Sequence, residues 1–503
     1  MNLIVGDTIQ GIVSDFGSDG EGVIKLDGYP VFVPYAIKGE EIRARVTYVK
    51  KDCAFGELVK VLSPSPSRVK PRCPYFGKCG GCDLQHADTH LQLEIKRTGV
   101  ENALKKFAGL DIAERSAEQN NSRRFDEVQI KEKTAEPNAM RLVIQTPVRL
   151  NDFEYRNKLS LPFAYNSHSG RVSLGFYEKR SHKVVPMKWC PLHGEWAADL
   201  ITALTEWANE FNISVYDENT HKGLLRHAVA RMLDTLSLTI VINGDRLPKS
   251  AELIEKLQKY FDDFALYISE NTHKNNVIFG DSVRLIYGQE KPQNLGKFEA
   301  VVSPKSFLQI NDKIRDAIYD EVAEALDGFA GDIVELYSGV GLLTAQLALR
   351  MQNANIISVE IEPSASRDAE KLMQTLGLSD RVKCICDDAK HYLDNENCDA
   401  KRGDQKSSCK TQDNSGEKNN LAKSQSSEKR RALILDPPRR GCDREVLDRA
   451  TGFDKIVYIS CNPQTLARDL KILSKEYSVE FVKPFDMFPQ TANIEVMAVL
   501  SSK

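Results

Sequence analysis

The C-terminal part of the chain alternates short apolar runs with helical stretches, and this alternation constrains the fold more than any other feature of the sequence. From about residue 301 onward, five segments have the composition of strands: GDIVELYSG, NIISVEIE, RVKCICDD, ALILDPPR and KIVYISC. Helical stretches such as LLTAQLALRM and NPQTLARDLKILSKEY lie between and after them. An alternation of this length is typical of a doubly wound, mainly parallel sheet. The sequence therefore predicts an α/β domain over residues 301–503.

The rest of the sequence predicts two further regions, so the chain of 503 residues is expected to be an α/β multidomain protein. Residues 1–62 alternate apolar and polar positions between glycine-containing turns, which predicts a small closed β-barrel of the oligonucleotide-binding (OB) type. Residues 63–300 mix β-rich and helical segments and predict an α+β region. Two polar stretches, 111–139 and about 394–431, cannot bury a core, so we expect surface insertions there, the second of them disordered.

Composition narrows the class of protein. Hydrophobic residues make up 41% and charged residues 28% of the chain, an ordinary balance for a soluble globular protein. No secretory signal opens the sequence and no run reaches about 20 apolar residues, so we expect a cytoplasmic protein without a membrane span. With a net charge of −3, a surface for nucleic acid must be local. The basic residues of the N-terminal module, which could form such a surface or a merely solvated strand face, are Lys38, Arg43, Arg45, Lys50 and Lys51.

The turn ELYSGVGLLT, residues 335–344, follows a predicted strand and precedes a predicted helix, where α/β sheets bind ligands. Gly339 and Gly341 allow a ligand to approach the backbone, and Glu360, at the end of the next strand, can bind two ribose hydroxyls. The third glycine of the dinucleotide fingerprint is absent, and Glu335 would repel a pyrophosphate. S-adenosylmethionine, which is cationic and has no phosphate, fits better; a turn without a ligand is the alternative.

Two other strand ends carry residues that could perform chemistry. Asp436 ends the fourth predicted strand, and Cys461 ends the fifth, just before a predicted helix. A thiol near a helix N-terminus can have a lowered pKa, which makes Cys461 a candidate nucleophile. The alternative is a small buried side chain, the commoner role of a free cysteine. Glu495 lies in the apolar run IEVMAV. A carboxylate there is costly to bury unless it has a partner or a catalytic role. The alternative is that Glu495 points to the solvent face of an edge strand.

Three of the 11 cysteines fall within residues 73–82, CPYFGKCGGC. Disulfides are rare in the cytosol, so a disulfide is not expected here. Structural zinc and a [4Fe–4S] cluster both prefer four thiolates, and Cys73, Cys79 and Cys82 would need a fourth ligand. The spacing alone favours zinc.

Taken together, the motifs ELYSGVG, LDPPRRG, YISCNPQTLARDL and DMFPQTANIE resemble those of the RNA uracil-C5-methyltransferase family. The most similar type has a TRAM domain and an iron–sulfur cluster and acts on 23S rRNA. Further similar segments are YRNK (155–158), LGFYEKRSH (174–182), LRHAVAR (225–231) and SFLQIN (306–311), so the resemblance covers nearly the whole chain outside the two polar stretches. It implies a TRAM barrel, a central domain with a [4Fe–4S] cluster, and a C-terminal Rossmann-like domain that uses S-adenosylmethionine.

The resemblance also implies a role for each matching residue. Cys461 matches the nucleophile that adds to C6 of uracil, and Glu495 matches the base that removes the C5 proton. The positions implied to contact S-adenosylmethionine are Gln309, Tyr337, Gly339, Gly341, Leu342, Glu360, Asp388 and Asp436, with Asp387 as the alternative to Asp388. The chain departs from the family at Ser338, where a cysteine is common, and at Gln490 or Asn493, where a histidine is common.

The implied partners follow from the same comparison of motifs. Cys190, in KWCPLH, matches the distant fourth cluster ligand, which favours one [4Fe–4S] cluster on Cys73, Cys79, Cys82 and Cys190 over zinc. The barrel and YRNK are expected to hold RNA. The expected substrate is a uridine of 23S rRNA, with tRNA as the alternative, and we expect a monomer.

Three other functions fit the sequence less well. An RNA cytosine-C5-methyltransferase would have a second cysteine within its fourth-strand motif, whereas Cys442 lies six residues beyond Asp436. A radical S-adenosylmethionine enzyme would have the spacing C-x3-C-x2-C instead of C-x5-C-x2-C. A non-catalytic RNA-binding protein or RNA chaperone would not need Cys461 or Glu495.

Overall fold

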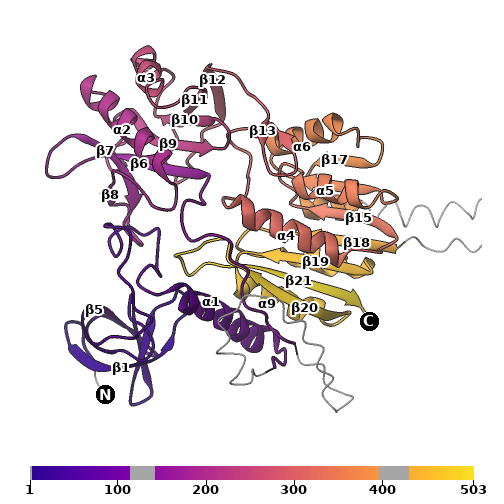
Figure 1. Ribbon diagram of the computed structural model, residues 1–503, viewed down its shortest axis with the longest axis horizontal. Coiled ribbons are helices and arrows are strands. Elements are labelled where there is room, and N and C mark those ends of the chain that lie inside the picture. The colour runs from indigo at the N-terminus through magenta and orange to yellow at the C-terminus, as the bar shows by residue number, and fades with distance from the viewer. Residues whose placement is uncertain (1–2, 114–141, 396–429) are drawn as a thin grey trace, which may run out of the picture.

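The computed structural model describes residues 3–113, 142–395 and 430–503, which form three regions of regular structure (Figure 1). A barrel and a central sheet lie at the lower and upper left of that view, and the C-terminal sheet lies at the right. Most of the two predicted insertions falls outside the described residues. Their described ends belong to the fold: Ile112 is buried and forms a β-bridge with Leu142, and Arg430 begins a strand.

The N-terminal module is a closed barrel of five strands, as predicted. Its strands, in the order β1-β2-β3-β5-β4 around the barrel, are β1 (Thr8–Phe16), β2 (Gly22–Leu26), β3 (Tyr29–Val33), β4 (Glu41–Val49) and β5 (Ala54–Ser63). Successive side chains of a strand face opposite sides. In β4, Ile42 and Val46 therefore pack in the barrel core, while Arg43 and Arg45 remain exposed.

The central region is a seven-stranded sheet in the order β12-β11-β10-β9-β6-β7-β8. Its strands are β6 (Lys158–Tyr165), β7 (Val172–Tyr177), β8 (Val184–Pro186), β9 (Leu225–Met232), β10 (Leu236–Ile242), β11 (Phe264–Glu270) and β12 (Ser282–Tyr287). Helices α2 (Glu195–Glu210) and α3 (Ser250–Leu257) share a hydrophobic core with it. A short hairpin, β13 (Gln293–Asn294) and β14 (Glu299–Ala300), leads toward the C-terminal region.

The C-terminal sheet has seven strands in the order β17-β16-β15-β18-β19-β21-β20. Its strands are β15 (Gly331–Leu336), β16 (Ile356–Glu360), β17 (Val382–Cys386), β18 (Arg430–Leu435), β19 (Lys455–Ser460), β20 (Tyr477–Phe485) and β21 (Glu495–Ser502). The strands from β15 to β19 run parallel, and β21 runs antiparallel to both of its neighbours. The predicted doubly wound sheet is therefore confirmed.

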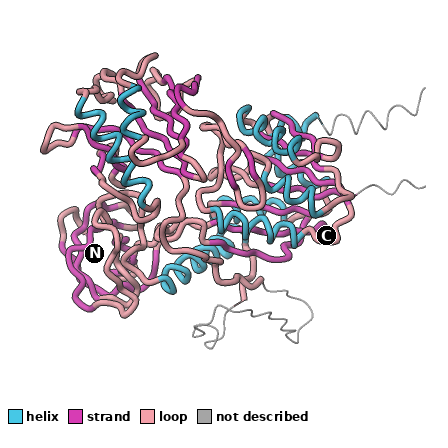
Figure 2. The backbone as a smooth tube through the Cα atoms, turned by 45° about the horizontal axis from the view of Figure 1, so that its top comes forward, coloured by secondary structure: helices cyan, strands magenta, loops and turns pink. Residues whose placement is uncertain are grey.

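Helices cover both faces of this sheet (Figure 2). One face carries α4 (Asp312–Ala325), α5 (Leu342–Arg350) and α6 (Pro363–Thr375). The other carries α8 (Arg444–Arg449), which ends in a 3₁₀ turn (Ala450–Gly452), and α9 (Pro463–Leu473). Helix α1 (Thr89–Ala103) and its π-helical extension (Leu104–Ala108) precede the central sheet in sequence but pack against α9.

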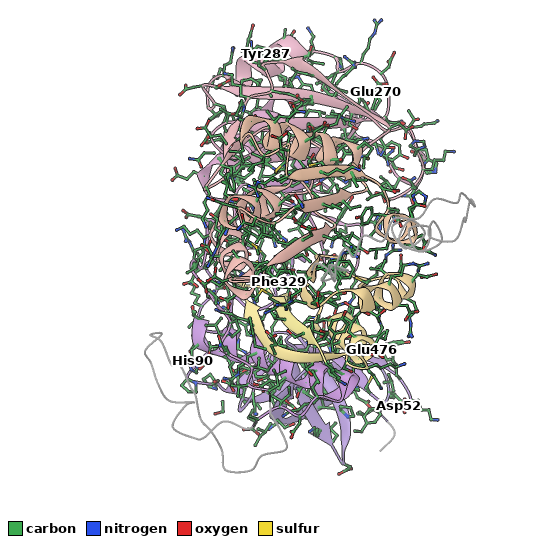
Figure 3. The ribbon with its side chains drawn as sticks, turned by 90° about the vertical axis from the view of Figure 1, so that its right-hand side faces the viewer. Asp52, His90, Glu270, Tyr287, Phe329 and Glu476 are labelled. Carbon is green, nitrogen blue, oxygen red and sulfur yellow. The ribbon has the colours of Figure 1, made fainter. Side chains whose placement is uncertain are left out.

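Figure 3 shows the C-terminal sheet, with Phe329 and Glu476 labelled beside it, between the central sheet and the barrel. Glu270 and Tyr287 mark the central sheet in that view, and Asp52 marks the barrel. No helix within the described ranges is long and apolar enough to cross a membrane.

Candidate active site

The candidate catalytic residues meet at one edge of the C-terminal sheet because they follow the ends of adjacent strands. Asp436 follows β18 and Cys461 follows β19, and these two strands are parallel neighbours. Strand β21 runs in the opposite direction and pairs its Val496 with Ser460 of β19. Glu495, the first residue of β21, therefore lies beside Cys461 at the same edge of the sheet.

Glu495 is 2% exposed, and its strand lies between β19 and β20. A place on the solvent face of an edge strand, one of the sequence-based alternatives, is therefore excluded. Burial raises the pKa of Glu495 well above its ordinary value, the charge of Asp436 raises it further, and Arg439 opposes both. A buried carboxyl with a raised pKa is the kind of group that proteins use to accept a proton near neutral pH.

Cys461 is partly buried beside the same charged groups. Burial raises the pKa of its thiol to about 11, and Glu495 and Asp436 contribute in the same direction. Arg439 lowers the pKa, both by its charge and by a hydrogen bond to the sulfur. The expectation of a lowered pKa is therefore wrong for the protein without its substrates, because burial and two acids outweigh the start of helix α9.

Arg439 is the residue of this site that the sequence analysis missed. Its carbonyl oxygen accepts hydrogen bonds from Asn462 Nδ2 at 3.1 Å and Thr465 Oγ1 at 3.3 Å, which fix it against the start of α9. Its Nη2 donates to Asn493 Oδ1 at 3.5 Å, two residues before Glu495. The motif LDPPRRG contains the arginine, but its pairing with the cysteine arises only when β18 and β19 lie side by side.

We expect Cys461 to be alkylated slowly at neutral pH and more slowly still in an Arg439→Gln variant. A thiol pKa of about 11 implies that the rate with iodoacetamide rises about tenfold per pH unit between pH 7 and 10. Loss of the arginine should lower that rate by about another tenfold, since one pKa unit changes the thiolate fraction tenfold. Mass spectrometry of the Cys461 peptide measures this rate apart from the other cysteines, and equal rates in both proteins would contradict the pairing.

The glycine turn after β15 has left-handed backbone angles, with Gly339 partly exposed and Gly341 buried against α6. Gly339 and Gly341 have φ angles of +57° and +76°, and a Cβ on Gly341 would lie 2.9 Å from the Cβ of Ala369. The N–H of Gly339 donates to Glu360 Oε2 at 2.9 Å, and the N–H of Glu362 donates to Oε1 at 2.8 Å. Glu360 is thus fixed beside the turn and partly exposed, where sheets of this kind bind a ribose.

Two other residues predicted to contact the cofactor, Gln309 and Leu342, are buried. The segment that carries Gln309 passes over the turn, since the carbonyl oxygen of Phe307 lies 3.7 Å from where a Cβ on Gly339 would be. The Gln309 residue is 9% exposed in this segment. Leu342 is 2% exposed and packs in the hydrophobic core, so its side chain is not available to a ligand.

The end of β17 carries the two acids between which the sequence could not decide. Asp388 Oδ1 accepts hydrogen bonds from the N–H groups of Lys390 at 2.9 Å and His391 at 3.3 Å, and so caps the following helical segment. Asp387 pairs with His391 Nδ1 at 2.8 Å. Asp388 is the more exposed of the two.

Acidic side chains lie around the turn. Glu335 is 4% exposed beneath it and accepts a hydrogen bond from Thr344 Oγ1 at 2.5 Å. Burial raises the pKa of Glu335 to about 8, with the charges of Asp436 and Glu360 adding to the effect, and burial also raises the pKa of Asp436 to about 7. Such a set of carboxyl groups favours a cationic ligand over a pyrophosphate.

Two residues with hydroxyl or thiol groups lie behind this site. Tyr337 has a φ of +65° and a pKa raised by burial, and its hydroxyl is hydrogen-bonded to Cys442. Cys442 is 4% exposed, and its N–H donates to Asp469 Oδ2 at 3.0 Å. Burial raises the Cys442 pKa to about 12. The residue is therefore part of a buried polar contact and is not presented as a second nucleophile.

The four cysteines predicted as ligands line one cavity of about 60 Å³. Three come from the loop after the barrel, and Cys190 comes from the stretch after β8. The N–H of Gly81 lies 3.4 Å from Cys79 Sγ and Gln85 Nε2 lies 3.2 Å from Cys82 Sγ, each as a donor. Burial raises the thiol pKa to about 12 for Cys82 and about 11 for Cys190.

The four thiols of this cavity suit a metal group bound by thiolates, although they are not arranged in a metal-binding geometry. Across the described ranges, no group of three or more His, Cys, Asp or Glu side chains is arranged to hold a metal ion. Arg156 also lines the cavity, and its buried Nε has no hydrogen-bond partner. Four thiols with a cation beside them fit an anionic cluster.

The chain is similar to known proteins over nearly its whole length. Residues 420–503 match the family model of tRNA (uracil-5-)-methyltransferases, and residues 3–59 match the TRAM domain. The chain is 31% identical to a protein of Halalkalibacterium halodurans described as an uncharacterized RNA methyltransferase, over 99% of this chain and 97% of the relative. A Staphylococcus epidermidis protein of the same description is 32% identical, over 98% and 97%.

A solved structure shares the fold over the full length. It is the crystal structure of Pyrococcus abyssi tRNA (uracil-54, C5)-methyltransferase in complex with S-adenosyl-L-homocysteine, with a TM-score of 0.67 and 24% sequence identity. The match covers 98% of this chain and 99% of that chain. The arrangement of the three regions is therefore one that a natural protein adopts.

Proposed function

Since the chain belongs to the RNA uracil-5-methyltransferases that carry a TRAM domain, we propose that it methylates C5 of a specific uridine through Cys461 and Glu495. S-adenosylmethionine supplies the methyl group as a sulfonium and would bind at the glycine turn beside Glu360. The main observation in support is that Cys461, Arg439 and Glu495 lie close together where β19 ends and β21 begins.

The proposed reaction follows from the chemistry of uracil, whose C5 is a poor nucleophile. Cys461 loses its thiol proton to solvent and its Sγ bonds to C6 as the thiolate, and the electron pair of the C5–C6 double bond moves toward C5, which then takes the methyl group. Glu495 accepts the C5 proton, the C5–C6 double bond forms again, and the C6–Sγ bond breaks. Arg439 stabilises the thiolate both before addition and after its release.

The product nucleoside tests this proposal. The protein is incubated with 23S rRNA or tRNA and methyl-labelled S-adenosylmethionine, and the RNA is digested to nucleosides for mass spectrometry. We expect the label in 5-methyluridine. Label in 5-methylcytidine, or no label on either RNA, would overturn the proposal.

We propose 23S rRNA as the substrate, with tRNA as the second candidate. The cysteine pattern resembles that of the iron–sulfur members that act on 23S rRNA, whereas the matching family and the similar solved structure are both named for tRNA. The target base must leave its stack for Cys461 to reach C6, which loops of folded RNA allow. Mapping 5-methyluridine in total RNA from cells with and without the protein decides between the two.

We propose that the cysteine cavity holds a [4Fe–4S] cluster with a structural role. The support is the set of four sulfurs around one cavity with Arg156 beside them. Protein purified without oxygen should contain about four iron atoms and absorb visible light, and Cys190→Ser should lose most of that iron while α1 and the C-terminal sheet stay folded. A protein with zinc in place of iron would support the alternative and contradict the cluster.

The barrel offers a surface for unpaired bases. Tyr48 is 55% exposed, its ring centroid lies 6.3 Å from that of Phe55, and Phe32 stacks on Phe55 at 5.5 Å. Lys50 Nζ lies 5.5 Å from the centroid of Phe55, so a cation accompanies the rings. Aromatic faces beside basic groups are typical of single-stranded RNA binding.

We expect Tyr48→Ala to raise the KM for RNA about tenfold and to change kcat by less than about twofold, because stacking contributes roughly 1–3 kcal/mol per base. Steady-state methylation measures both constants. Ile12→Ala is the matched control, since Ile12 is 65% exposed on β1 and has no ring. The same change in KM for both variants would contradict a stacking surface.

A further inference from the structure

A buried polar network holds the segment that leads into Glu495, residues 486–494. The side chains of Lys96, on α1, and Asp486 are fully buried, with Lys96 Nζ 2.5 Å from Asp486 Oδ1. Lys96 Nζ also donates to the carbonyl oxygen of Phe488 at 3.0 Å, and Arg149 Nη1 lies 3.2 Å from Asp486 Oδ2. A buried ion pair contributes little net stability, because desolvation offsets the attraction. Stability alone therefore does not account for this arrangement.

A second set of contacts fixes the same segment at Gln490. This residue is 4% exposed and has a φ of +72°. Its carbonyl oxygen accepts from the N–H groups of Asp83 at 3.1 Å and Leu84 at 3.0 Å. Gln92 of α1 donates to Gln490 Oε1 at 3.1 Å and accepts from the Gln490 N–H at 3.2 Å. Both the backbone and the side chain of Gln490 are thus held from outside the C-terminal sheet.

These contacts continue to the reacting groups. Thr491 Oγ1 donates at 2.8 Å to the carbonyl oxygen of Phe488, the same atom that Lys96 binds. The side chain of Asn493 then accepts a hydrogen bond from Arg439, and Glu495 is the first residue of β21. Lys96 and Gln92 are both buried within this network, 2% and 1% exposed.

We propose that Lys96 and Gln92 are positioning residues for the general base, holding Glu495 against the C5 proton of the methylated uracil. The inference rests on the proposed function. Glu495 acts only after the methyl group has been transferred: its carboxylate takes the C5 proton, C5=C6 forms, and the C6–Sγ bond breaks. Loosening the segment therefore slows release of the product more than it slows addition of Cys461.

The test follows the covalent intermediate in Lys96→Met and Gln92→Leu variants of the full chain. With ordinary RNA and S-adenosylmethionine, we expect turnover to fall about tenfold and the methylated protein–RNA adduct on denaturing gels to rise about tenfold. With 5-fluorouridine RNA, whose fluorine cannot leave as a proton, adduct formation should match the wild type within about twofold. Lys96→Arg, which keeps the charge, should recover most of the turnover.

Arg68→Met is the matched control, because Arg68 also pairs with a buried acid, Glu40, at 2.5 Å in the barrel region. It should lower the melting temperature without accumulating adduct. Should Lys96→Met not fold, Gln92→Leu decides the question, since it removes no charge.

The result that overturns the positioning role is a wild-type adduct level in folded Lys96→Met and Gln92→Leu, or equal accumulation in Arg68→Met. A wild-type protein that forms no 5-methyluridine is a different result: it overturns the proposed function, and the positioning role with it.

Discussion

A Cys461→Ala protein should form no 5-methyluridine and no covalent adduct with 5-fluorouridine RNA. Without the thiol, nothing adds to C6, and C5 does not become nucleophilic enough to take the methyl group. We expect the methylation rate to fall by at least about 10⁴-fold, the scale on which enzymes lose activity when a covalent nucleophile is removed. Labelled methyl incorporation and a denaturing gel measure the two effects.

The variant must still bind its ligands for this result to identify the nucleophile. The glycine turn and Glu360 lie at other strand ends, so binding of S-adenosylmethionine should change by less than about twofold, a loss too small to lower the rate by a power of ten. Cys53→Ala, in the hairpin between β4 and β5, is the matched control and should methylate at the wild-type rate. An adduct in Cys461→Ala would assign the nucleophile to another residue.

The sheet and its glycine turn could be predicted because their determinants are local. An apolar run followed by glycines specifies a strand and a tight turn without reference to the rest of the chain, and Gly339 and Gly341 do adopt left-handed angles. Parallel strands place their carboxyl ends at one edge, so Asp436 and Cys461 had to be neighbours if β18 and β19 were. The structure makes them so.

The parts of the site that could not be predicted from the sequence depend on contacts between distant segments. The run IEVMAV fits an edge strand as well as an interior one, and only the insertion of β21 between β19 and β20 buries Glu495. The pKa of Cys461 could not be predicted from its place before α9, because burial raises it and Glu495 and Asp436 raise it further. The Lys96–Asp486 pair joins α1 to a loop near the C-terminus, which no local pattern indicates.

A Glu495→Gln protein should transfer the methyl group once and then fail to release the RNA. The glutamine keeps the size of the buried side chain but cannot accept the C5 proton, so the C6–Sγ bond stays intact. We expect release to slow by about 10²–10⁴-fold, the usual contribution of a general base. A denaturing gel with methyl-labelled S-adenosylmethionine should show label in a protein–RNA band that the wild type does not accumulate.

Release in the wild type should depend on pH in the same direction. Burial, followed by the charge of Asp436, raises the pKa of Glu495, so its basic form is lost as the pH falls through that raised value. Release of RNA from the methylated adduct should therefore slow at lower pH in the wild type and stay slow at all pH values in Glu495→Gln. A Cys461→Ala/Glu495→Gln double variant should form no adduct, because addition precedes deprotonation. Normal turnover in Glu495→Gln would instead assign the proton to another group, and Asp436, the other acid that acts on the pKa of Cys461, would be the next residue to replace.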